Sequence, residues 1–357
     1  MNTIIIEYII FSVFIGLFSV IINALFLRFS GNLGTRNTDP EAVRWSANTK
    51  PALGGISFYI TFLLSVAFYS VFLRLQPDFL NIQMMGILGA VSLGFLLGLA
   101  DDAYNTKPMM KLGLQILCGL ILISTGTYIT VLPNIYLNYA LTMFWVIGLM
   151  NSINMLDNMD AITTSISIST VIGALCIIFF EVIFLNTIHL AMLVGVLAGL
   201  CGFLVFNWNP SKMYMGDTGS QFLGVFLAAI GIVFFWNAPD RYGNVIQSKQ
   251  FIVAIFLFII PICDTATVTI NRLRKGTSPF VGGKDHTTHH LSYFGFSDRG
   301  VALTLGGLSL ATMVLAVFVV NFIEDWTIWH FWGFAAYFVL VFILLYVNTL
   351  INWKEKK

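Results

Sequence analysis

Repeated apolar runs of roughly 20 residues divide this sequence, and they restrict its fold more than any other feature. A helix of about 20 residues crosses the hydrocarbon core of a bilayer, so each run is long enough to span a membrane. Hydrophobic residues make up 58% of the 357 residues and charged residues only 10%, too little charge for the surface of a water-soluble domain. The sequence therefore predicts an all-α, polytopic integral membrane protein.

We expect ten or eleven transmembrane helices, because the fourth and fifth runs are short and only a turn at Pro133 separates them. The first run lacks a basic start and a small-residue cleavage site, so we interpret it as an uncleaved transmembrane helix. We expect residues 1–357 to form one transmembrane domain, without an internal repeat or a soluble domain. The eleven runs centre on residues 4–27, 52–73, 84–100, 111–125, 137–152, 161–180, 188–206, 218–236, 250–271, 300–321 and 329–351.

The distribution of Lys and Arg predicts that the N-terminus lies outside and the C-terminus inside. In this orientation all but three of the 18 basic residues fall in inside connections, the exceptions being Arg74, Arg241 and Lys249. Basic residues are enriched in the cytoplasmic loops of membrane proteins, whereas the opposite orientation would reverse the bias. The cytoplasmic loops would then be about 28–51, 101–111, 153–161, 207–217 and 272–299.

The acidic residues also divide between inside and outside connections. Acids in the outside turns, Asp240 among them, are explained by solvation. Acids beside apolar helix ends are costly unless they are paired or bound to a metal, so the inside acids indicate that several loops converge on one cytoplasmic face. These inside acids are Asp101, Asp102, Asp157, Asp160, Asp217 and Asp285.

Residues 206–224 form a short polar break between two apolar segments. At its centre, Met-Gly-Asp-Thr-Gly-Ser places Asp217 among small residues and hydroxyl groups. A magnesium–phosphate site needs an anionic oxygen for the hard cation and glycines that let phosphate approach the backbone. The alternative is a turn between two helices with a capping Asp.

Asp101 and Asp102 are adjacent carboxylates at a predicted membrane edge. Two such groups repel each other and require a cation or a proton. They could coordinate a metal, directly or through water, or accept a proton from a phosphate.

Lys50 precedes Pro51 and a Gly54-Gly55 pair, at the predicted start of a helix. A lysine held against a rigid turn at a helix start suits a diphosphate. The alternative is that its charge only enforces the membrane topology.

Polar residues recur at every third position in the run Asn151-x-x-Asn154-x-x-Asp157-x-x-Asp160. Neighbours three apart share one face of a helix, so consecutive members can meet one ligand. Asparagine amides beside carboxylates match the donors and acceptors of a nucleobase or a sugar. The alternative is a polar seam that forms hydrogen bonds within the bundle.

Three of the five histidines lie within the basic loop 272–299, at His286, His289 and His290. The loop could bind zinc, but a cationic loop that closes over phosphates fits the composition better. Asp264 lies within the ninth run and is expected to pair with a basic residue of the bundle, without an assigned chemistry.

Four motifs occur here in a fixed order: Asp101-Asp102, the Asn and Asp run from Asn151, Asn-x-x-Pro followed by Met-Gly-Asp-Thr-Gly-Ser, and the histidine loop. Together they resemble the polyprenyl-phosphate N-acetylhexosamine-1-phosphate transferases, glycosyltransferase family 4. The resemblance covers about residues 30–300. That family includes bacterial enzymes that start O-antigen, enterobacterial common antigen and wall teichoic acid, the peptidoglycan enzyme translocase I, and the eukaryotic dolichol-pathway enzyme.

The resemblance implies a transferase of the cell membrane with its active site on the cytoplasmic face. Such an enzyme moves a sugar-1-phosphate, here N-acetylglucosamine-1-phosphate, from a UDP-sugar donor to undecaprenyl or another polyprenyl phosphate and releases UMP. It uses Mg²⁺, with Mn²⁺ as an alternative, has no nucleic-acid partner, and is compatible with a homodimer. The reaction would start a lipid-linked glycan of the cell envelope.

The resemblance also implies roles for residues at matching motif positions. Asp217 would be the Mg²⁺ ligand, and Asp101 and Asp102 the catalytic acids near the lipid phosphate, with Asp101 as proton acceptor. The residues expected to bind substrate are Lys50, Asn154, Asp157, Asp160, Asn207, His286, His289 and His290. Within this set, Asn207, Asp157 and Asp160 would hold the uridine and its diphosphate, and Lys50, His286 and His289 would contact phosphates.

Three departures from the family pattern affect these roles. Asn105 stands where an acid or lysine is usual, and Asp157-Asn158-Met159-Asp160-Ala161 replaces Asp-Gly-x-Asp-Gly. Asn tolerates a left-handed backbone better than Ala, so the geometry near Ala161 could differ. His290 stands where an arginine is common.

Two other functions compete with this interpretation. The three consecutive histidines of translocase I are absent, which favours a simple N-acetylhexosamine donor over the muramyl-pentapeptide donor of peptidoglycan synthesis. A lipid or ion transporter would place its ionisable groups near the bilayer midplane, often in broken helices. A structural membrane scaffold would not account for carboxylates gathered on one face.

Overall fold

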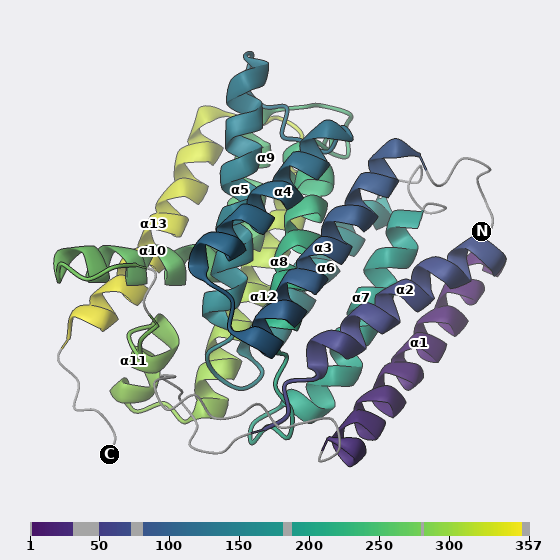
Figure 1. The fold of residues 1–357 in the computed structure, drawn as a ribbon. Helices are drawn as coiled ribbons and strands as arrows, with labels where there is room; N and C mark the ends of the chain where they lie inside the picture. Colours follow the sequence, from purple (N-terminus) through teal and green to yellow (C-terminus); the bar gives the residue numbers. More distant parts are fainter. Residues whose placement is uncertain (1, 31–49, 73–80, 181–187, 280–281, 352–357) are drawn as a thin grey trace.

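The computed structural model describes residues 2–30, 50–72, 81–180, 188–279 and 282–351, and every regular element in these ranges is helical (Figure 1). The predicted all-α fold is therefore confirmed. The elements are α1 (Asn2–Phe29), α2 (Gly54–Phe72), α3 (Ile82–Tyr104), α4 (Pro108–Ser124), α5 (Ile135–Leu156), α6 (Ile162–Phe180), α7 (Ile188–Asn207), α8 (Gly216–Gly231), the π-helical turn η2 (Ile232–Trp236), α9 (Gln247–Leu257), α10 (Ile259–Arg274), α11 (Thr287–Phe294), α12 (Asp298–Phe322) and α13 (Ile328–Leu350).

Each predicted apolar run coincides with a helix or a helix pair. Nine helices in the described part of the chain are long and apolar enough to cross a membrane, and α4 is a shorter apolar helix. The ninth run differs from the prediction, because it breaks at Phe258 and α10 turns away from α9 by 77°. In Figure 1, α10 lies across the direction of the neighbouring helices.

The predicted orientation in the membrane stays a prediction. The start of α1 lies at one end of the bundle, whereas α11 and the last turn of α13 lie at the other end, which we call the site end (Figure 1). Several of the basic residues on which the prediction depends lie outside the described residues, namely Arg36, Arg44, Arg74, Lys354, Lys356 and Lys357.

Helix α8 forms the centre of the bundle. All of its residues from Thr218 to Gly231 are buried, and it packs against α2, α3, α5 and α6. The rings of Phe222 and Phe226 make edge contacts with Phe62 of α2 at centroid distances of 5.5 and 5.9 Å. By contrast, the buried side chains of α13 are only three, Val341, Leu345 and Thr349, as expected for a helix at the lipid-facing edge. The start of α8 is thus surrounded by other helices.

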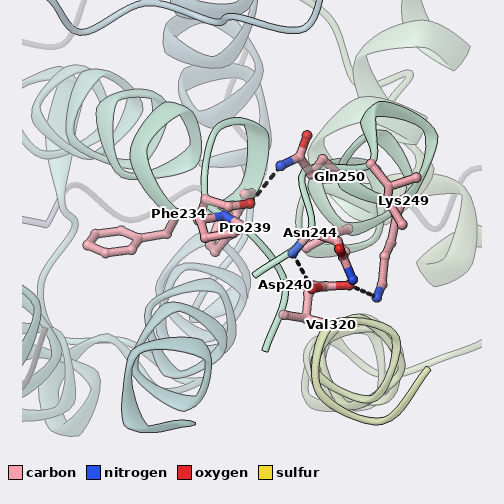
Figure 2. A pocket seen from close by; sticks show the side chains of 11 residues that line it. Phe234, Pro239, Asp240, Asn244, Lys249, Gln250 and Val320 are labelled. Carbon is pink, nitrogen blue, oxygen red and sulfur yellow. Dashed lines mark hydrogen bonds and ion pairs between the residues drawn. The ribbon is translucent and has the colours of Figure 1, made fainter. Parts of the chain in front are cut away.

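A buried ion pair fixes the connection between η2 and α9 at the end opposite the site (Figure 2). The Lys249 ammonium binds the Asp240 carboxylate and donates to the carbonyl of Ile323 at 2.6 Å. The side chains of Lys249 and Asp240 are 2% and 3% exposed. The expectation that solvation explains Asp240 is therefore wrong, because buried charges require a partner and Lys249 provides it.

Candidate active site

The start of α8 is held by a carboxylate from another helix. Asp102, near the end of α3, accepts hydrogen bonds from the backbone N–H of Asp217 at 3.1 Å and of Thr218 at 2.8 Å. The Thr218 hydroxyl donates to the same carboxylate at 2.7 Å. The first N–H groups of a helix have no partner within the helix, and a negative charge there is stabilising. The capping Asp considered from the sequence therefore exists, but it is Asp102 and not Asp217.

Two glycines allow this close approach. Gly216 has φ +73°, and a Cβ there would lie 2.6 Å from the Asp102 carboxylate. A Cβ at Gly98 of α3 would lie 2.2 Å from the carbonyl oxygen of Asp217. Since both distances are far below van der Waals contact, only glycine fits at either position. The Gly residues around Asp217 thus bring the backbones of α3 and α8 together at the site.

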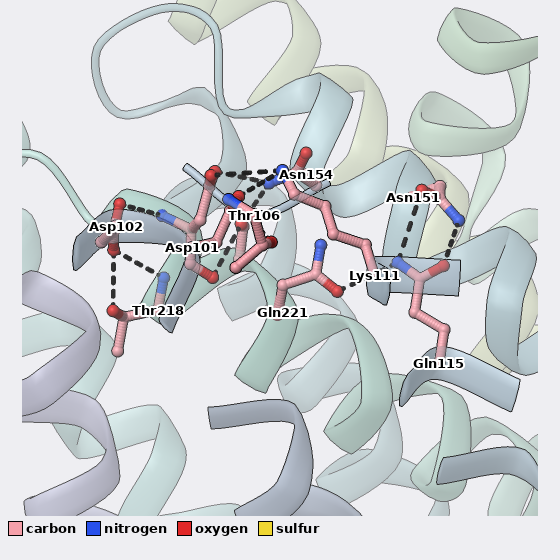
Figure 3. A network of polar contacts seen from close by, with 11 residues as sticks. Asp101, Asp102, Thr106, Lys111, Gln115, Asn151, Asn154, Thr218 and Gln221 are labelled. Carbon is pink, nitrogen blue, oxygen red and sulfur yellow. Dashed lines mark hydrogen bonds and ion pairs between the residues drawn. The ribbon is translucent and has the colours of Figure 1, made fainter. Parts of the chain in front are cut away.

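Asp101 faces Asp217, and Lys111 of α4 lies beside both. Figure 3 shows Asp101 and Lys111 in this network. The carboxyl groups of Asp101 and Asp217 are close enough to share a hydrogen bond. Lys111 forms an ion pair with Asp101, and its Nζ lies 3.9 Å from Asp217 Oδ2. The other Asp101 oxygen accepts from the N–H and hydroxyl of Thr106 at 2.9 and 2.8 Å. The ammonium group of Lys111 therefore lies beside the two carboxylates that face each other.

Asn154, near the end of α5, joins the same cluster. Its Nδ2 donates to Asp217 Oδ1 and to Ser220 Oγ, both at 2.8 Å. One turn deeper, the amides of Gln115, Asn151 and Gln221 form a hydrogen-bonded layer (Figure 3). The bond from Asn154 fixes one oxygen of the Asp217 carboxylate, which restricts its orientation.

The cluster fits a divalent cation bound largely by substrate. Mg²⁺ prefers oxygen ligands and is usually held by one or two carboxylates together with phosphates and water. Asp101 and Asp217 provide two carboxylates within contact of each other. Across the described ranges, no three His, Cys, Asp or Glu side chains gather as a complete metal site. The two carboxylates therefore fit the ligand preference of Mg²⁺, and its binding here stays a prediction.

Asp157 follows α5 in a turn that faces the other acids. Burial, followed by the charges of Asp217, Asp102 and Asp160, raises the pKa of Asp157 to about 8. Four carboxylates from α3, the α5–α6 turn and α8 thus lie near one another. The predicted convergence of the acids is borne out for these residues.

Asp160 and Lys50 meet at the loop between α7 and α8. Asp160 accepts from Asn209 Nδ2 at 3.0 Å and from the N–H and hydroxyl of Ser211 at 2.9 and 2.7 Å. Lys50 Nζ lies 2.9 Å from Ser211 Oγ, 3.8 Å from Asp160 Oδ1 and 5.0 Å from the centroid of the Tyr214 ring. The two residues hold the loop in place, and contact with a diphosphate stays a prediction.

Asn207 is buried, and its side-chain amide forms hydrogen bonds with other residues of the protein. Its Oδ1 accepts from the Ala161 N–H at 3.1 Å and the Thr164 hydroxyl at 2.8 Å, and its Nδ2 donates to the Met213 carbonyl at 3.1 Å. These bonds join the end of α7 to the α5–α6 turn. Its predicted contact with the nucleoside is untested, and this geometry gives it a role in shaping the turn.

The departures from the family pattern have specific backbone consequences. Asn105 ends α3 with φ +50°, and its N–H donates to the Asp101 carbonyl at 2.9 Å. Asn is tolerated in this left-handed conformation. Ala161 has φ +65°, so it adopts the conformation usual for Gly despite its Cβ. The backbone at Ala161 is thus locally strained.

The three histidines lie at the start of, or within, a short helix that the sequence analysis did not predict. His286 precedes α11, and His289 and His290 lie within it. Burial and then the charge of His286 lower the pKa of His289 to about 3, and burial followed by Lys275 lowers the pKa of His290. Thr288 donates to Asn158 Oδ1 at 2.7 Å, which places α11 beside the turn that carries Asp157.

Asp264 pairs with His286, as its predicted need for a basic partner suggested. The two side chains lie 2.8 Å apart.

Sequence reasoning missed Lys111 as a site residue and counted it only as a basic residue of a loop. Its position in the first turn of an apolar helix, after Pro108, was the signal that could have identified it.

The fold and the acid cluster define a polytopic membrane protein with an anionic, lysine-neutralised site at the ends of several helices. Residues 84–235 match the family described as glycosyl transferase family 4. This match confirms the resemblance drawn from the motifs of the sequence.

Curated relatives cover most of the chain. A Bacillus subtilis (strain 168) protein described as a "probable undecaprenyl-phosphate N-acetylglucosaminyl 1-phosphate transferase" is 25% identical over 317 residues, which cover 86% of this chain and 82% of the relative. A decaprenyl-phosphate N-acetylglucosaminephosphotransferase of Mycobacterium leprae (strain TN) is 28% identical, covering 71% of this chain and 69% of the relative. A phospho-N-acetylmuramoyl-pentapeptide-transferase of Streptococcus agalactiae serotype Ia is 28% identical, covering 70% and 77%. These relatives are phosphosugar transferases.

Proposed function

We propose that this protein transfers N-acetylglucosamine-1-phosphate from UDP-N-acetylglucosamine to undecaprenyl phosphate, releasing UMP and starting a lipid-linked glycan of the cell envelope. The observation that carries the proposal is the cluster of Asp101, Lys111 and Asp217 at the site end of the bundle. Carboxylates for a hard cation and a lysine for phosphate are the groups that phosphoryl transfer requires. The names of the relatives support the same reaction class.

In the proposed reaction, a phosphate oxygen of the lipid forms a bond to the phosphorus that carries the sugar. The bond from that phosphorus to the bridging oxygen breaks, and UMP leaves with that oxygen and its electron pair. A phosphate monoester has a second pKa of about 6 and is already mostly ionised near neutral pH, so proton removal by Asp101 contributes little. The chain's main task is to position the two phosphates and to neutralise their charge.

The residues of the cluster divide this task. Asp217 would hold Mg²⁺ with Asp101 within reach, and the bound ion would act as a Lewis acid on the diphosphate. Lys111 would neutralise phosphate charge and suppress repulsion between Asp101 and Asp217. Asp102 orients the start of α8 and thereby the Asp217 carboxylate.

The proposed cellular setting follows from the reaction. We place the site end on the cytoplasmic face of the plasma membrane, where a UDP-sugar and the lipid phosphate can meet. A homodimer in the membrane belongs to the same proposal.

A panel of donors tests the substrate. Purified protein in detergent would be incubated with Mg²⁺, undecaprenyl phosphate and one of UDP-N-acetylglucosamine, UDP-N-acetylgalactosamine or UDP-N-acetylmuramoyl-pentapeptide. We expect UMP release and a lipid-linked sugar with UDP-N-acetylglucosamine. Release only with the muramyl-pentapeptide donor would favour the peptidoglycan reaction, which the Streptococcus agalactiae relative represents. The absence of UMP with every donor, from folded protein, would contradict the enzyme proposal.

A transporter is less consistent with the same observations. The ninth span is broken, as in many transporters, and it carries the buried Asp264 beyond the break. However, the partners of Asp264 are His286 and Thr287 at α11, which also contacts the α5–α6 turn beside the acid cluster. The broken span therefore connects to the candidate active site.

A further inference from the structure

Asp264 is fully buried, yet its carboxylate is well satisfied by hydrogen bonds. Its Oδ2 lies 2.8 Å from His286 Nδ1, and its Oδ1 accepts from the Thr287 N–H at 2.8 Å and the Thr287 hydroxyl at 2.6 Å. The exposure of Asp264 is 0%. All three of these contacts come from the two residues that begin α11, which lie more than 20 positions further along the chain.

These contacts place a negative charge at the N-terminus of α11. His286 is the N-cap residue of that helix, but its own side chain makes no capping hydrogen bond. Asp264 instead accepts from the first N–H of the helix, where a negative charge is favourable. The same carboxylate therefore fixes the start of α11 and the imidazole of His286.

The connection before α11 is held against α10 by a second pair. Arg272 donates through Nε and Nη2 to both oxygens of Asp285, at 2.8 and 2.7 Å, and through Nη1 to the Pro279 carbonyl at 2.7 Å. Partial burial alone would raise the pKa of Asp285, but the hydrogen bonds and charge of Arg272 hold it below its usual range. Because the adjacent residues Asp285 and His286 are each bound to α10, the backbone leading into the histidines has little freedom.

Helix α11 also contacts the α5–α6 turn, beside the acid cluster. Thr288 donates to Asn158, whose Nδ2 donates to the Met155 carbonyl at the end of α5. The ring of His289 lies against that of His286, with centroids 5.4 Å apart. A continuous set of contacts therefore runs from Asp264 through His286 and α11 to the turn that carries Asp157.

We propose that Asp264 is a positioning residue that acts through His286, holding the proton on Nδ1 and directing Nε2 toward the phosphates of the substrate. This inference rests on the proposed phosphosugar transfer. A carboxylate bound to one ring nitrogen selects which nitrogen carries the proton and sets the orientation of the ring. The fixed ring then meets the substrate phosphates without losing side-chain freedom on binding.

A double-mutant cycle tests the coupling between the two residues. We expect Asp264→Asn to lower kcat/KM by about 10- to 100-fold, by analogy with the loss of a partner that orients a metal-binding histidine. In a His286→Gln background, the same Asp264 substitution should change kcat/KM by less than about twofold, because the group through which it acts is already absent. Equal losses in both backgrounds would overturn the proposal.

Thr287→Val is the matched control. It removes one hydrogen bond to Asp264 and leaves His286 in place, so kcat/KM should fall by less than about threefold. A loss as large as that of Asp264→Asn would show that the start of α11, and not the histidine, transmits the effect, and would also overturn the proposal.

A measurement on the unsubstituted chain needs neither turnover nor a folded Asp264 variant. In protein labelled with ¹⁵N-histidine, the His286 signal, assigned by its loss in His286→Gln, should show a proton on Nδ1. An unprotonated Nδ1 would overturn the proposal. If no donor yields UMP, the proposed function fails, whereas this spectrum still decides whether Asp264 holds the Nδ1 proton.

Discussion

Asp102 binds the start of α8 through Thr218, whose N–H and hydroxyl lie 2.8 and 2.7 Å from the same carboxylate oxygen. Its neighbour Asp101 instead forms an ion pair with Lys111 and faces Asp217. The adjacent acids, which the sequence presents as an equivalent pair, therefore do different work: one orients a helix and the other belongs to the charged cluster.

This difference predicts separate effects of substitution. Asp102→Ala should lower the stability of the fold by about 1–2 kcal/mol, as loss of a helix cap does, and Asp102→Asn should lower it less because an amide oxygen still accepts. Asp101→Asn should reduce UMP release more than Asp102→Asn does. Thermal unfolding in detergent and turnover per folded molecule measure the two effects. Equal melting temperatures for the wild type and Asp102→Ala would contradict the capping role.

Lys111 should be required for turnover. Lys111→Met removes the cation beside Asp101 and Asp217, and we expect UMP release to fall by about 100-fold or more, as when one preorganised charge-stabilising group is lost. The control is Lys107→Met, since Lys107 is exposed and its side chain makes no capping bond at the start of α4. If both variants retained the activity of the wild type, Lys111 would not belong to the site.

Ala161 should be a source of local strain. Its φ of +65° costs an L-residue roughly 1–2 kcal/mol, whereas glycine adopts it freely but loses more chain entropy on folding. Ala161→Gly should therefore raise stability by about 0.5–1 kcal/mol. Ala174→Gly, inside α6, should lower stability by about 1 kcal/mol and serves as the control. A lower melting temperature for Ala161→Gly would show that the position is not strained.

His289 should make the fold sensitive to acid. Its pKa is about 3 in the folded protein, chiefly because of burial, whereas an unfolded chain has an ordinary value near 6.5. As the pH falls, the unfolded state therefore binds the proton at a higher pH than the folded state does. The stability that neutral His289 contributes is fully present above pH ~6.5 and is lost as the pH falls toward ~3. Protonation of this one group lowers the free energy of unfolding by at most about 1.4 kcal/mol per pH unit.

The comparison that isolates this effect uses His289→Gln. Melting temperatures from pH 7.5 to 4.5 should fall less steeply for the variant than for the wild type. Parallel curves for the two proteins would mean that His289 carries no such linkage.

The sequence predicted the helices well because the length and hydrophobicity of a run are local properties. Every predicted run coincides with a helix or a helix pair, and the acids of the inside connections Asp101, Asp102, Asp157 and Asp217 lie together as expected. The expectation that these acids converge followed from the placement of Lys and Arg, which predicts the connections that share one side of the membrane and requires no knowledge of side-chain contacts.

What the sequence did not predict depends on contacts between distant segments. The bond between Asp102 and Thr218 joins residues 116 positions apart, and no local pattern separates the role of Asp102 from that of Asp101. The ion pair of Lys249 with Asp240 likewise depends on packing between η2 and α9. The break at Phe258, by contrast, has a local signal: Pro261 has no backbone N–H to donate to the carbonyl of Leu257, so a continuous helix is disfavoured there.

The most direct test of the central claim is the rate of UMP release by the wild type and by Asp217→Asn, with Mg²⁺, undecaprenyl phosphate and UDP-N-acetylglucosamine. The matched control is Asp298→Asn, because Asp298 is also an acid in the first turn of a helix but lies outside the acid cluster. We expect the wild type and Asp298→Asn to release UMP at similar rates in a Mg²⁺-dependent manner, and Asp217→Asn to release none while folding normally. UMP release by Asp217→Asn at the rate of the wild type would contradict the account.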